Sequence, residues 1–267
     1  MKHIKYIILF SIILNTACEK VIEVPLENAD QKIVIEAPLS NLTDRSYILI
    51  SKTGNVYEES NFEKVSGANV TITDKDNNVY TFLEDVAGSG KYIDTTFKVG
   101  ENNIYKLKVE AEGQTFTSEC ITQTLTPLNY IFPIKIETPK STPQNPDSVN
   151  LVFFSFDDNA NETNFYRFKV YKNGKYTKEL YLGDDKLING QTFQQPFYSD
   201  SFDSGDTVDV EMQNIDKANY TYFYSMSNAQ SNSPFTASPA NPVSNIEGGA
   251  LGYYGCYLID IKSVIVP

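Results

Sequence analysis

The stretch Ile104-Tyr105-Lys106-Leu107-Lys108-Val109-Glu110, followed by Glu112-Gly113-Gln114 and Thr115-Phe116-Thr117, decides the fold class. Apolar and polar side chains alternate in both runs, and a short glycine turn separates them. Successive side chains of a β-strand point to opposite faces, so alternation with a period of two predicts half-buried strands. The turn between the runs predicts that they form an antiparallel hairpin.

The same alternation recurs in the residues that precede this hairpin. Asp74-Lys75-Asp76-Asn77-Asn78 separates two of the runs and suits a tight turn, because asparagine tolerates a positive φ. The further strands are predicted at residues 32–36, 46–51, 69–73, 79–83 and 91–93. A series of short alternating strands with turn signals between them is typical of an immunoglobulin-like sandwich. We predict that this sandwich spans residues 32–125.

The second half of the chain, residues 126–267, begins at a linker marked by Thr126-Pro127. Strands are predicted at residues 149–156, 165–171, 176–180, 207–212 and 253–266. The sequence therefore predicts an all-β chain with two tandem immunoglobulin/fibronectin-like β-sandwiches. The second of them is expected to contain one inserted helix.

The inserted helix is predicted at residues 216–230. Asp216 is a favourable N-cap, and Tyr220, Phe223 and Tyr224 recur at helical spacing. We expect these three rings to pack on the sheet and Tyr222 to point elsewhere.

The N-terminus carries an export signal. Residues 1–17 combine a basic start with an apolar run, and small or polar residues lead to Cys18. Because the apolar run is far shorter than the ~20 residues of a spanning helix, it predicts a cleaved signal peptide. We expect Cys18 to be lipidated with fatty acids such as palmitate, which hold the chain on a membrane. Residues 18–31 are then a lipidated tether. The sequence leaves open which face of the outer membrane the protein occupies, because Glu19-Lys20 is not a strongly acidic run.

Composition limits the chemistry that the chain can perform. The chain has 22 basic and 34 acidic residues, a formal net charge of −12, which disfavours nucleic acid as a partner. Its one histidine, His3, lies in the signal peptide, which excludes histidine-based nucleophilic catalysis and histidine zinc sites from the mature chain. No cofactor and no metal site are expected, since the Asp74–Asp85 segment lacks the glycine and glutamate of a calcium loop. A carboxylate-pair hydrolase is the enzyme class that remains open.

Two cysteines remain beside Cys18. Export permits a disulfide between Cys120 and Cys256. The two residues fall in different predicted domains, however, which favours two buried and unpaired thiols.

Two groups of residues are candidates for contact or modification. Phe193, Phe197, Tyr198 and Phe202 lie in a segment rich in Gln, Ser and Asp, which is predicted to be a loop with an exposed contact surface. Thr95, Ser148 and Thr207 each follow an aspartate, a short pattern used for bacterial O-glycosylation, and are candidate glycosylation sites.

Three features together resemble a known family. They are Cys18-Glu19-Lys20-Val21-Ile22, Ser66-Gly67-Ala68-Asn69-Val70-Thr71-Ile72, and the ending Asn241 to Gly249 with Leu251-Gly252-Tyr253-Tyr254-Gly255. The chain resembles the Bacteroidota lipoproteins of domain of unknown function family 4249, although Cys256 stands where a small residue is expected. The resemblance implies an outer-membrane lipoprotein that works beside a TonB-dependent transporter. It implies no catalytic residues.

These observations predict a non-enzymatic accessory or binding subunit that a lipid anchors to the outer membrane. Two alternatives remain open. One is a free-standing surface module that binds a glycan or a protein, and the other is a carboxylate-pair glycoside hydrolase.

Overall fold

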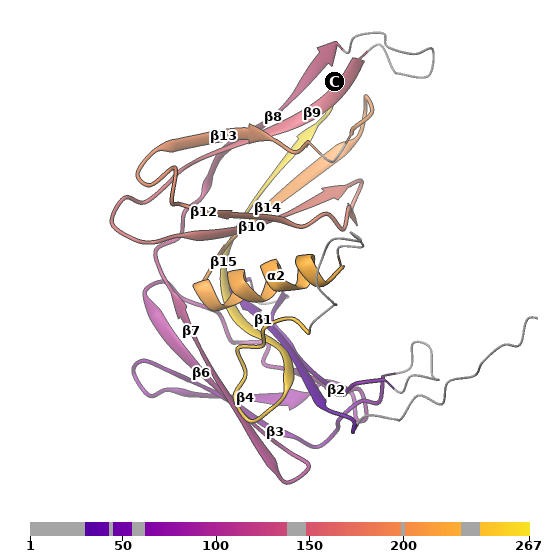
Figure 1. Ribbon diagram of the computed structural model, residues 1–267, viewed down its shortest axis with the longest axis vertical. Coiled ribbons are helices and arrows are strands. Elements are labelled where there is room, and N and C mark those ends of the chain that lie inside the picture. Colours follow the sequence, from indigo (N-terminus) through magenta and orange to yellow (C-terminus); the bar gives the residue numbers. More distant parts are fainter. Residues whose placement is uncertain (1–29, 43–44, 55–61, 138–147, 199–200, 231–240) are drawn as a thin grey trace, which may run out of the picture.

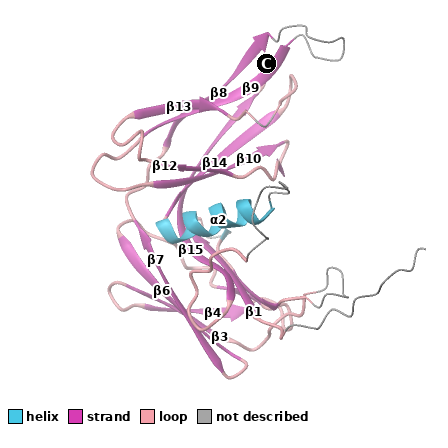
Figure 2. Ribbon diagram, in the orientation of Figure 1, coloured by secondary structure: helices cyan, strands magenta, loops and turns pink. Residues whose placement is uncertain are grey.

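The computed structural model describes residues 30–42, 45–54, 62–137, 148–198, 201–230 and 241–267. The predicted signal peptide, residues 1–17, and Cys18 lie outside these residues. Strands dominate the described chain, with one helix among them (Figure 2). The N-terminal half contains β1 (Ile33–Ser40), β2 (Ile48–Lys52), β3 (Asn69–Asp74), β4 (Val79–Glu84), β5 (Lys91–Ile93), β6 (Asn103–Ala111) and β7 (Gln114–Thr122).

The C-terminal half contains the remaining strands and the helix. They are β8 (Leu128–Glu137), β9 (Ser148–Asp157), β10 (Phe165–Lys172), β11 (Lys175–Tyr176), β12 (Tyr181–Asp184), β13 (Thr192–Pro196), β14 (Thr207–Ile215), α2 (Lys217–Gln230) and β15 (Leu251–Ile265). The seven strands predicted in the N-terminal half are confirmed. Residues 176–180 were predicted as one strand, but only Tyr176 is in a strand, and residues 177–180 separate the short β11 from β12.

One long strand joins the two halves. The first residues of β15 pair in parallel with β1, from Val34–Leu251 to Ser40–Tyr257. Its later residues pair antiparallel with β14, from Asn214–Leu258 to Thr207–Ile265. Figure 1 shows this yellow strand running from the N-terminal strands into the C-terminal ones. A 12-stranded mixed sheet results, in the order β11-β10-β14-β15-β1-β2-β5-β4-β3-β6-β7 with β12 beside β10.

The prediction that the strands form two tandem sandwiches is therefore wrong. The chain is mostly β, as predicted, but it forms one large mixed sheet and a small three-stranded sheet, β13-β9-β8. The core of the N-terminal half is completed by Ile246, Ala250, Tyr254 and Cys256 from the far end of the chain. Alternation reveals a strand and its buried face, but it does not reveal which distant strand lies beside it.

A second buried cluster fills the space between the small sheet and the C-terminal part of the large one. It contains Phe154, Phe168, Phe197 and Val210 among others. A third, smaller cluster lies under α2 and contains Tyr222, Phe223, Tyr257 and Ile259. The helix therefore covers the region where the two halves meet (Figure 1).

Strand β8 was not predicted, and its sequence explains why. Pro133 lies in the middle of β8, and a proline cannot donate a hydrogen bond to a neighbouring strand. The structure accommodates it because β8 is at the edge of the three-stranded sheet, where only β9 pairs with it. Strand β13, at the other edge, was also missed because its polar residues suggested a loop.

The predicted helix is confirmed, but its faces are not as expected. Asp216 caps the helix, and its carboxylate accepts a hydrogen bond of 2.8 Å from the backbone N–H of Asn219. Phe223 is buried as predicted, whereas Tyr222 is buried and Tyr224 is 55% exposed. The helix packs against β10, β12 and β15, so its buried face is wider than one stripe of residues.

The turn before β14 supplies a pH-dependent stabilisation. The carboxylate of Asp206 has three positively polarised contacts. They are the ammonium of Lys172 at 2.8 Å, the backbone N–H of Asp203 at 2.7 Å and the side-chain amide of Asn173 at 2.7 Å. They lower the pKa of Asp206 from 3.8 to about 2. A lowered carboxyl pKa stabilises the fold above the unfolded pKa, and this stabilisation is lost as the pH falls toward about 2.

We expect Asp206→Asn to remove part of the decline in stability between pH 4 and pH 2, as measured by urea unfolding at several pH values. Asp203→Asn is the matched control, because the Asp203 side chain contacts the same lysine at 3.2 Å but is 90% exposed. If the free energy of unfolding of Asp206→Asn falls between pH 4 and pH 2 as steeply as that of the wild type, the stabilising role of this carboxylate is contradicted.

Candidate functional site

A cleft of about 530 Å³ lies where the two halves meet the first turn of α2. Strand β7 and the residues after it form one wall, the start of β10 and the segment after β12 form another, and α2 forms the third. The lining residues are Ile121, Gln123, Thr163, Phe165, Lys186, Asp216, Lys217, Tyr220 and Thr221. Concave surfaces between structural units are frequent ligand and partner sites.

Aromatic rings form one wall of the cleft. The ring centroid of Tyr220 lies 5.1 Å from that of Phe165 and 6.1 Å from that of Tyr224, with the two tyrosine rings nearly parallel at 9°. Burial raises the pKa of Tyr220, so its hydroxyl stays protonated near neutral pH. These rings offer a flat apolar surface with a hydroxyl group at its rim.

Two lysines place positive charge at the cleft. The ammonium of Lys186 lies 2.9 Å from the carboxylate of Asp184, and this hydrogen bond raises the pKa of the lysine. Lys217 is exposed at the first helical position. Positive charge beside an apolar wall suits a partner with apolar and acidic groups.

Asp216 lies at the base of the cleft as a structural group. Burial raises the pKa of its carboxyl, while hydrogen bonds from the backbone of Asn219, Ile121 and Ala218 favour the charged form. The carboxylate is thus engaged with backbone groups of both β7 and α2. This arrangement couples the β7 wall to the helix.

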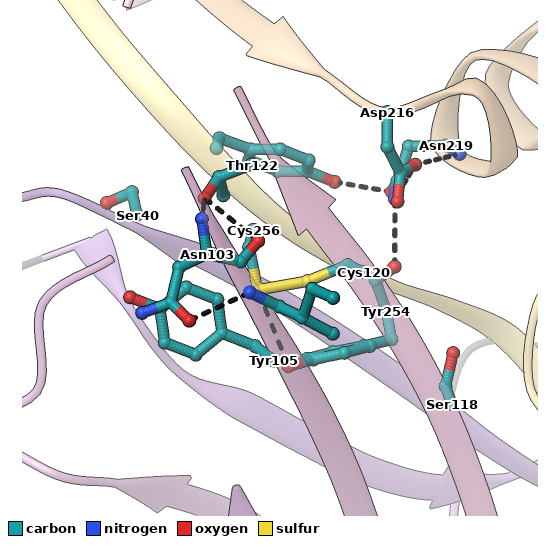
Figure 3. The surroundings of a disulfide bond; sticks show 12 residues. Ser40, Asn103, Tyr105, Ser118, Cys120, Thr122, Asp216, Asn219, Tyr254 and Cys256 are labelled. Carbon is teal, nitrogen blue, oxygen red and sulfur yellow. Dashed lines mark hydrogen bonds between the residues drawn. A yellow bond between two sulfur atoms is a disulfide. The ribbon is translucent and has the colours of Figure 1, made fainter. Parts of the chain in front are cut away.

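Asn219 fixes the helix to β15, as Figure 3 shows. Its side chain is fully buried, donates to the carbonyl oxygen of Tyr254 at 2.9 Å and accepts from the hydroxyl of Tyr257 at 3.0 Å. It also donates to the Asp216 carboxylate at 2.8 Å. The three bonds satisfy a buried polar group and hold the first helical turn on the strand.

A disulfide joins Cys120 to Cys256, which corrects the prediction of two unpaired thiols (Figure 3). Their Cα atoms lie 6.1 Å apart, within the usual range for such bonds. The prediction failed because it placed the two cysteines in separate domains, whereas β15 returns to the N-terminal core. The bond fixes β7 immediately before Ile121, a residue of the cleft wall.

The buried carboxylates elsewhere have fixed structural partners. Glu211 is 1% exposed and contacts the guanidinium of Arg45 and, at 3.9 Å, the ammonium of Lys169. Asp158 accepts hydrogen bonds from the Tyr166 hydroxyl and the backbone N–H of Gly190. In the described ranges no group of three or more His, Cys, Asp or Glu side chains is arranged to hold a metal ion.

The predicted contact surface is wrong for two of its four residues. Phe197 and Phe202 are buried, and the ring of Phe197 stacks on that of Phe154 with centroids 4.6 Å apart. Phe193 is half-buried against the same core. Only Tyr198 is well exposed, at 76%. The segment contains β13, which pairs with β9 and turns its aromatic side chains inward.

The candidate modification sites have different surroundings. Thr95 is exposed in a bend, whereas Ser148 and Thr207 are half-buried at the first residues of β9 and β14. Their glycosylation stays a prediction. Cys18 lies outside the described residues, so its lipidation also stays a prediction.

Sequence reasoning found Asp216 and Tyr220 but not the cleft that they border. Ile121, Phe165 and Lys186 come from three separate segments, and none of them stands in a motif. The sequence carries no signal for the cleft, because the 51% exposure of Ile121 is visible only in the structure.

Comparison with protein families gives one match. Residues 19–263 match the model of a family described as a domain of unknown function, DUF4249. A comparison with curated proteins finds no match. Within the described part of the chain, no helix has both the length and the apolar character needed to cross a bilayer.

Proposed function

The chain belongs to the DUF4249 family, and from that premise we propose that it is a lipoprotein of the outer membrane. In this proposal it acts as a non-enzymatic accessory or binding subunit beside a TonB-dependent transporter. The apolar run that ends at Cys18 supports the anchor. The cleft between β7, β10 and α2 is the surface that would receive the partner.

The exposed apolar residues at this cleft carry the proposal. Ile121 is 51% exposed in the wall, and the aromatic ring of Phe165 lies beside it in the lining. Leu187 is 90% exposed and follows the lining residue Lys186 in the chain, although it is not itself part of the lining. Apolar side chains grouped with aromatic rings and positive charges are typical of protein contact sites. The chain has a formal net charge of −12, so these lysines stand out against an acidic background.

Two other functions compete with this proposal. The cleft's aromatic wall, Phe165 and Tyr220, also suits a glycan, which stacks its flat face on such rings. A glycoside hydrolase would need two carboxylates facing a cleft, one of them protonated near neutral pH. Asp216 is the one carboxylate in the cleft lining, and its backbone hydrogen bonds favour a structural role.

Anchoring and partnership are tested in the same cells. We expect radiolabelled fatty acid to be incorporated into the wild-type chain and not into Cys18→Ala. Affinity capture of the full-length protein from detergent-solubilised outer membranes should then yield a TonB-dependent transporter, identified by mass spectrometry. Recovery of the wild-type protein alone, or with glycan-degrading activity, contradicts the proposal.

A variant with a charge introduced into the cleft tests whether the transporter is captured through the cleft. Ile121→Glu should reduce recovery of the transporter at least about tenfold, because it buries an unpaired charge in the contact. Leu83→Glu is the matched control, since Leu83 is an exposed strand residue of β4, 69% exposed and outside the cleft lining. Equal recovery with both variants would remove the cleft from the interface.

A further inference from the structure

A buried arginine in the C-terminal half makes no side-chain hydrogen bond to the residues that the structure describes. Arg167, on β10, is 9% exposed, and its Nε atom is buried without an acceptor. Its guanidinium carbon lies 3.9 Å from the centroid of the Phe223 ring on α2, a contact that compensates its charge in part. An arginine offers five N–H donors and cannot be deprotonated, so burial without acceptors is costly.

Two tyrosine rings lie beside the Phe223 ring that the guanidinium contacts. The centroids of Tyr222 and Tyr253 lie 4.9 Å apart, and the same rings lie 5.4 Å and 5.1 Å from that of Phe223. Tyr47, before β2, interacts electrostatically with Arg167 and with Tyr253. We call Arg167, Tyr47, Tyr222, Phe223 and Tyr253 the arginine–tyrosine cluster. It draws residues from β10, α2, β15 and the segment before β2.

The hydroxyls of the cluster are also unoccupied. Within the described ranges, the hydroxyls of Tyr47, Tyr222 and Tyr253 make no hydrogen bond, although the hydroxyls of Tyr254 and Tyr257 do. Burial raises the pKa of Tyr47, Tyr222 and Tyr253, which keeps each hydroxyl protonated as a donor near neutral pH. The charge of Arg167 thus acts on three tyrosines that come from different elements.

Charges of both signs lie near the cluster, and the negative charge of Glu36 acts on Tyr47, Tyr222 and Tyr253. Lys169, two residues from Arg167 on the same face of β10, has its pKa lowered by burial and by the charges of Arg167 and Arg45. Glu211 contacts Arg45 and Lys169 but not Arg167. Glu36, which faces Tyr253 across the β1–β15 pair, forms no ion pair with Arg167. No carboxylate of the described chain therefore neutralises Arg167 directly.

We propose that the arginine–tyrosine cluster is a binding site for the carboxylate group of a small organic acid. The planar guanidinium matches a carboxylate with two parallel N–H···O bonds, and the tyrosine hydroxyls donate to the remaining lone pairs. The rings of Tyr222 and Tyr253 would contact the carbon skeleton of the ligand. This site is separate from the cleft, since the two share no residue, and the inference does not depend on the transporter.

Calorimetry with the full-length protein in detergent tests the site. The probes are glucuronate with glucose as its neutral counterpart, N-acetyl-dialanine with its C-terminal amide, and inorganic phosphate. We expect heat from one carboxylate probe and none from its neutral counterpart, which also distinguishes an acidic sugar from a peptide terminus. Binding of phosphate alone, or of no carboxylate probe, overturns the proposal.

Variants separate a ligand site from a structural arginine. Arg167→Met should weaken binding of the carboxylate probe at least about tenfold, since a hydrogen-bonded charge pair is lost. It should leave the melting temperature unchanged or higher, because an unpaired buried charge is removed. A lower melting temperature with unaltered binding overturns the proposal.

The hydroxyls and Glu36 give matched comparisons. Tyr222→Phe should weaken binding several-fold, whereas Tyr224→Phe, on an exposed position of the same helix, should not. Glu36→Gln should strengthen binding, because it removes a negative charge beside the site. Equal affinity in Tyr222→Phe and Tyr224→Phe would exclude the hydroxyls from the site.

Discussion

Replacing both Cys120 and Cys256 by alanine should lower the free energy of unfolding by about 2–5 kcal/mol. The two cysteines are 136 residues apart in the chain, so the bond removes much conformational freedom from the unfolded state. For a chain of this size, each kcal/mol corresponds to about 2–4 °C in melting temperature. Thermal unfolding followed by circular dichroism measures the shift.

The wild-type protein in the presence of dithiothreitol is the control for this result. It should melt near the temperature of the double alanine variant, and the variant itself should be insensitive to the reductant. Loss of the bond should also loosen β7 next to Ile121, so capture of the partner through the cleft should weaken in the variant. A melting temperature that does not depend on the disulfide would contradict its stabilising role.

Gly252→Ala should have the largest effect of any small substitution that we consider. Gly252 pairs with Ile35 in the parallel ladder of β15 and β1 and has a φ of +96°, a region that residues with side chains rarely adopt. A Cβ atom there would overlap the carbonyl oxygen of Ile35 and lie 2.8 Å from its carbonyl carbon. Because backbone atoms cannot yield as a flexible side chain does, we expect a loss of at least about 3 kcal/mol.

Gly113→Ala separates the steric cost from the cost of the backbone conformation. Gly113 has a φ of +75°, but a Cβ atom at this position meets nothing within 4 Å. We expect it to cost about 1–2 kcal/mol from the left-handed conformation alone. Urea unfolding of the two variants measures the difference. Equal losses of unfolding free energy would mean that the close approach of β15 to β1 does not add to the cost of a side chain at Gly252.

The structural role of the glycines near the C-terminus is visible only in the three-dimensional structure. Leu251-Gly252-Tyr253-Tyr254-Gly255 supports the family resemblance, yet the sequence alone gives no reason for either glycine. In the structure Gly252 permits the contact with β1. A Cβ atom at Gly255 would overlap Asn219 and lie 2.6 Å from the Tyr257 hydroxyl, so this glycine makes room for the anchor of α2.

Local signals determined the elements of this protein. Alternation located the strands of the N-terminal half, and an N-cap aspartate followed by helical spacing located α2, because both signals depend on neighbours within a few residues. The absence of histidine after His3 limited the chemistry without any structure. Pro133 misled the same reasoning, since an edge position tolerates a proline that a central strand does not.

The tertiary structure decided everything that joins residues distant in the chain. The pairing of β15 with both β1 and β14 replaced two tandem sandwiches by one mixed sheet, and it brought Cys256 to Cys120. The tertiary structure also buries Phe197 and places the guanidinium of Arg167 against the Phe223 ring. The period of a pattern specifies which face of a strand is buried, but the partner strand is chosen by packing over the whole chain, which no local pattern encodes.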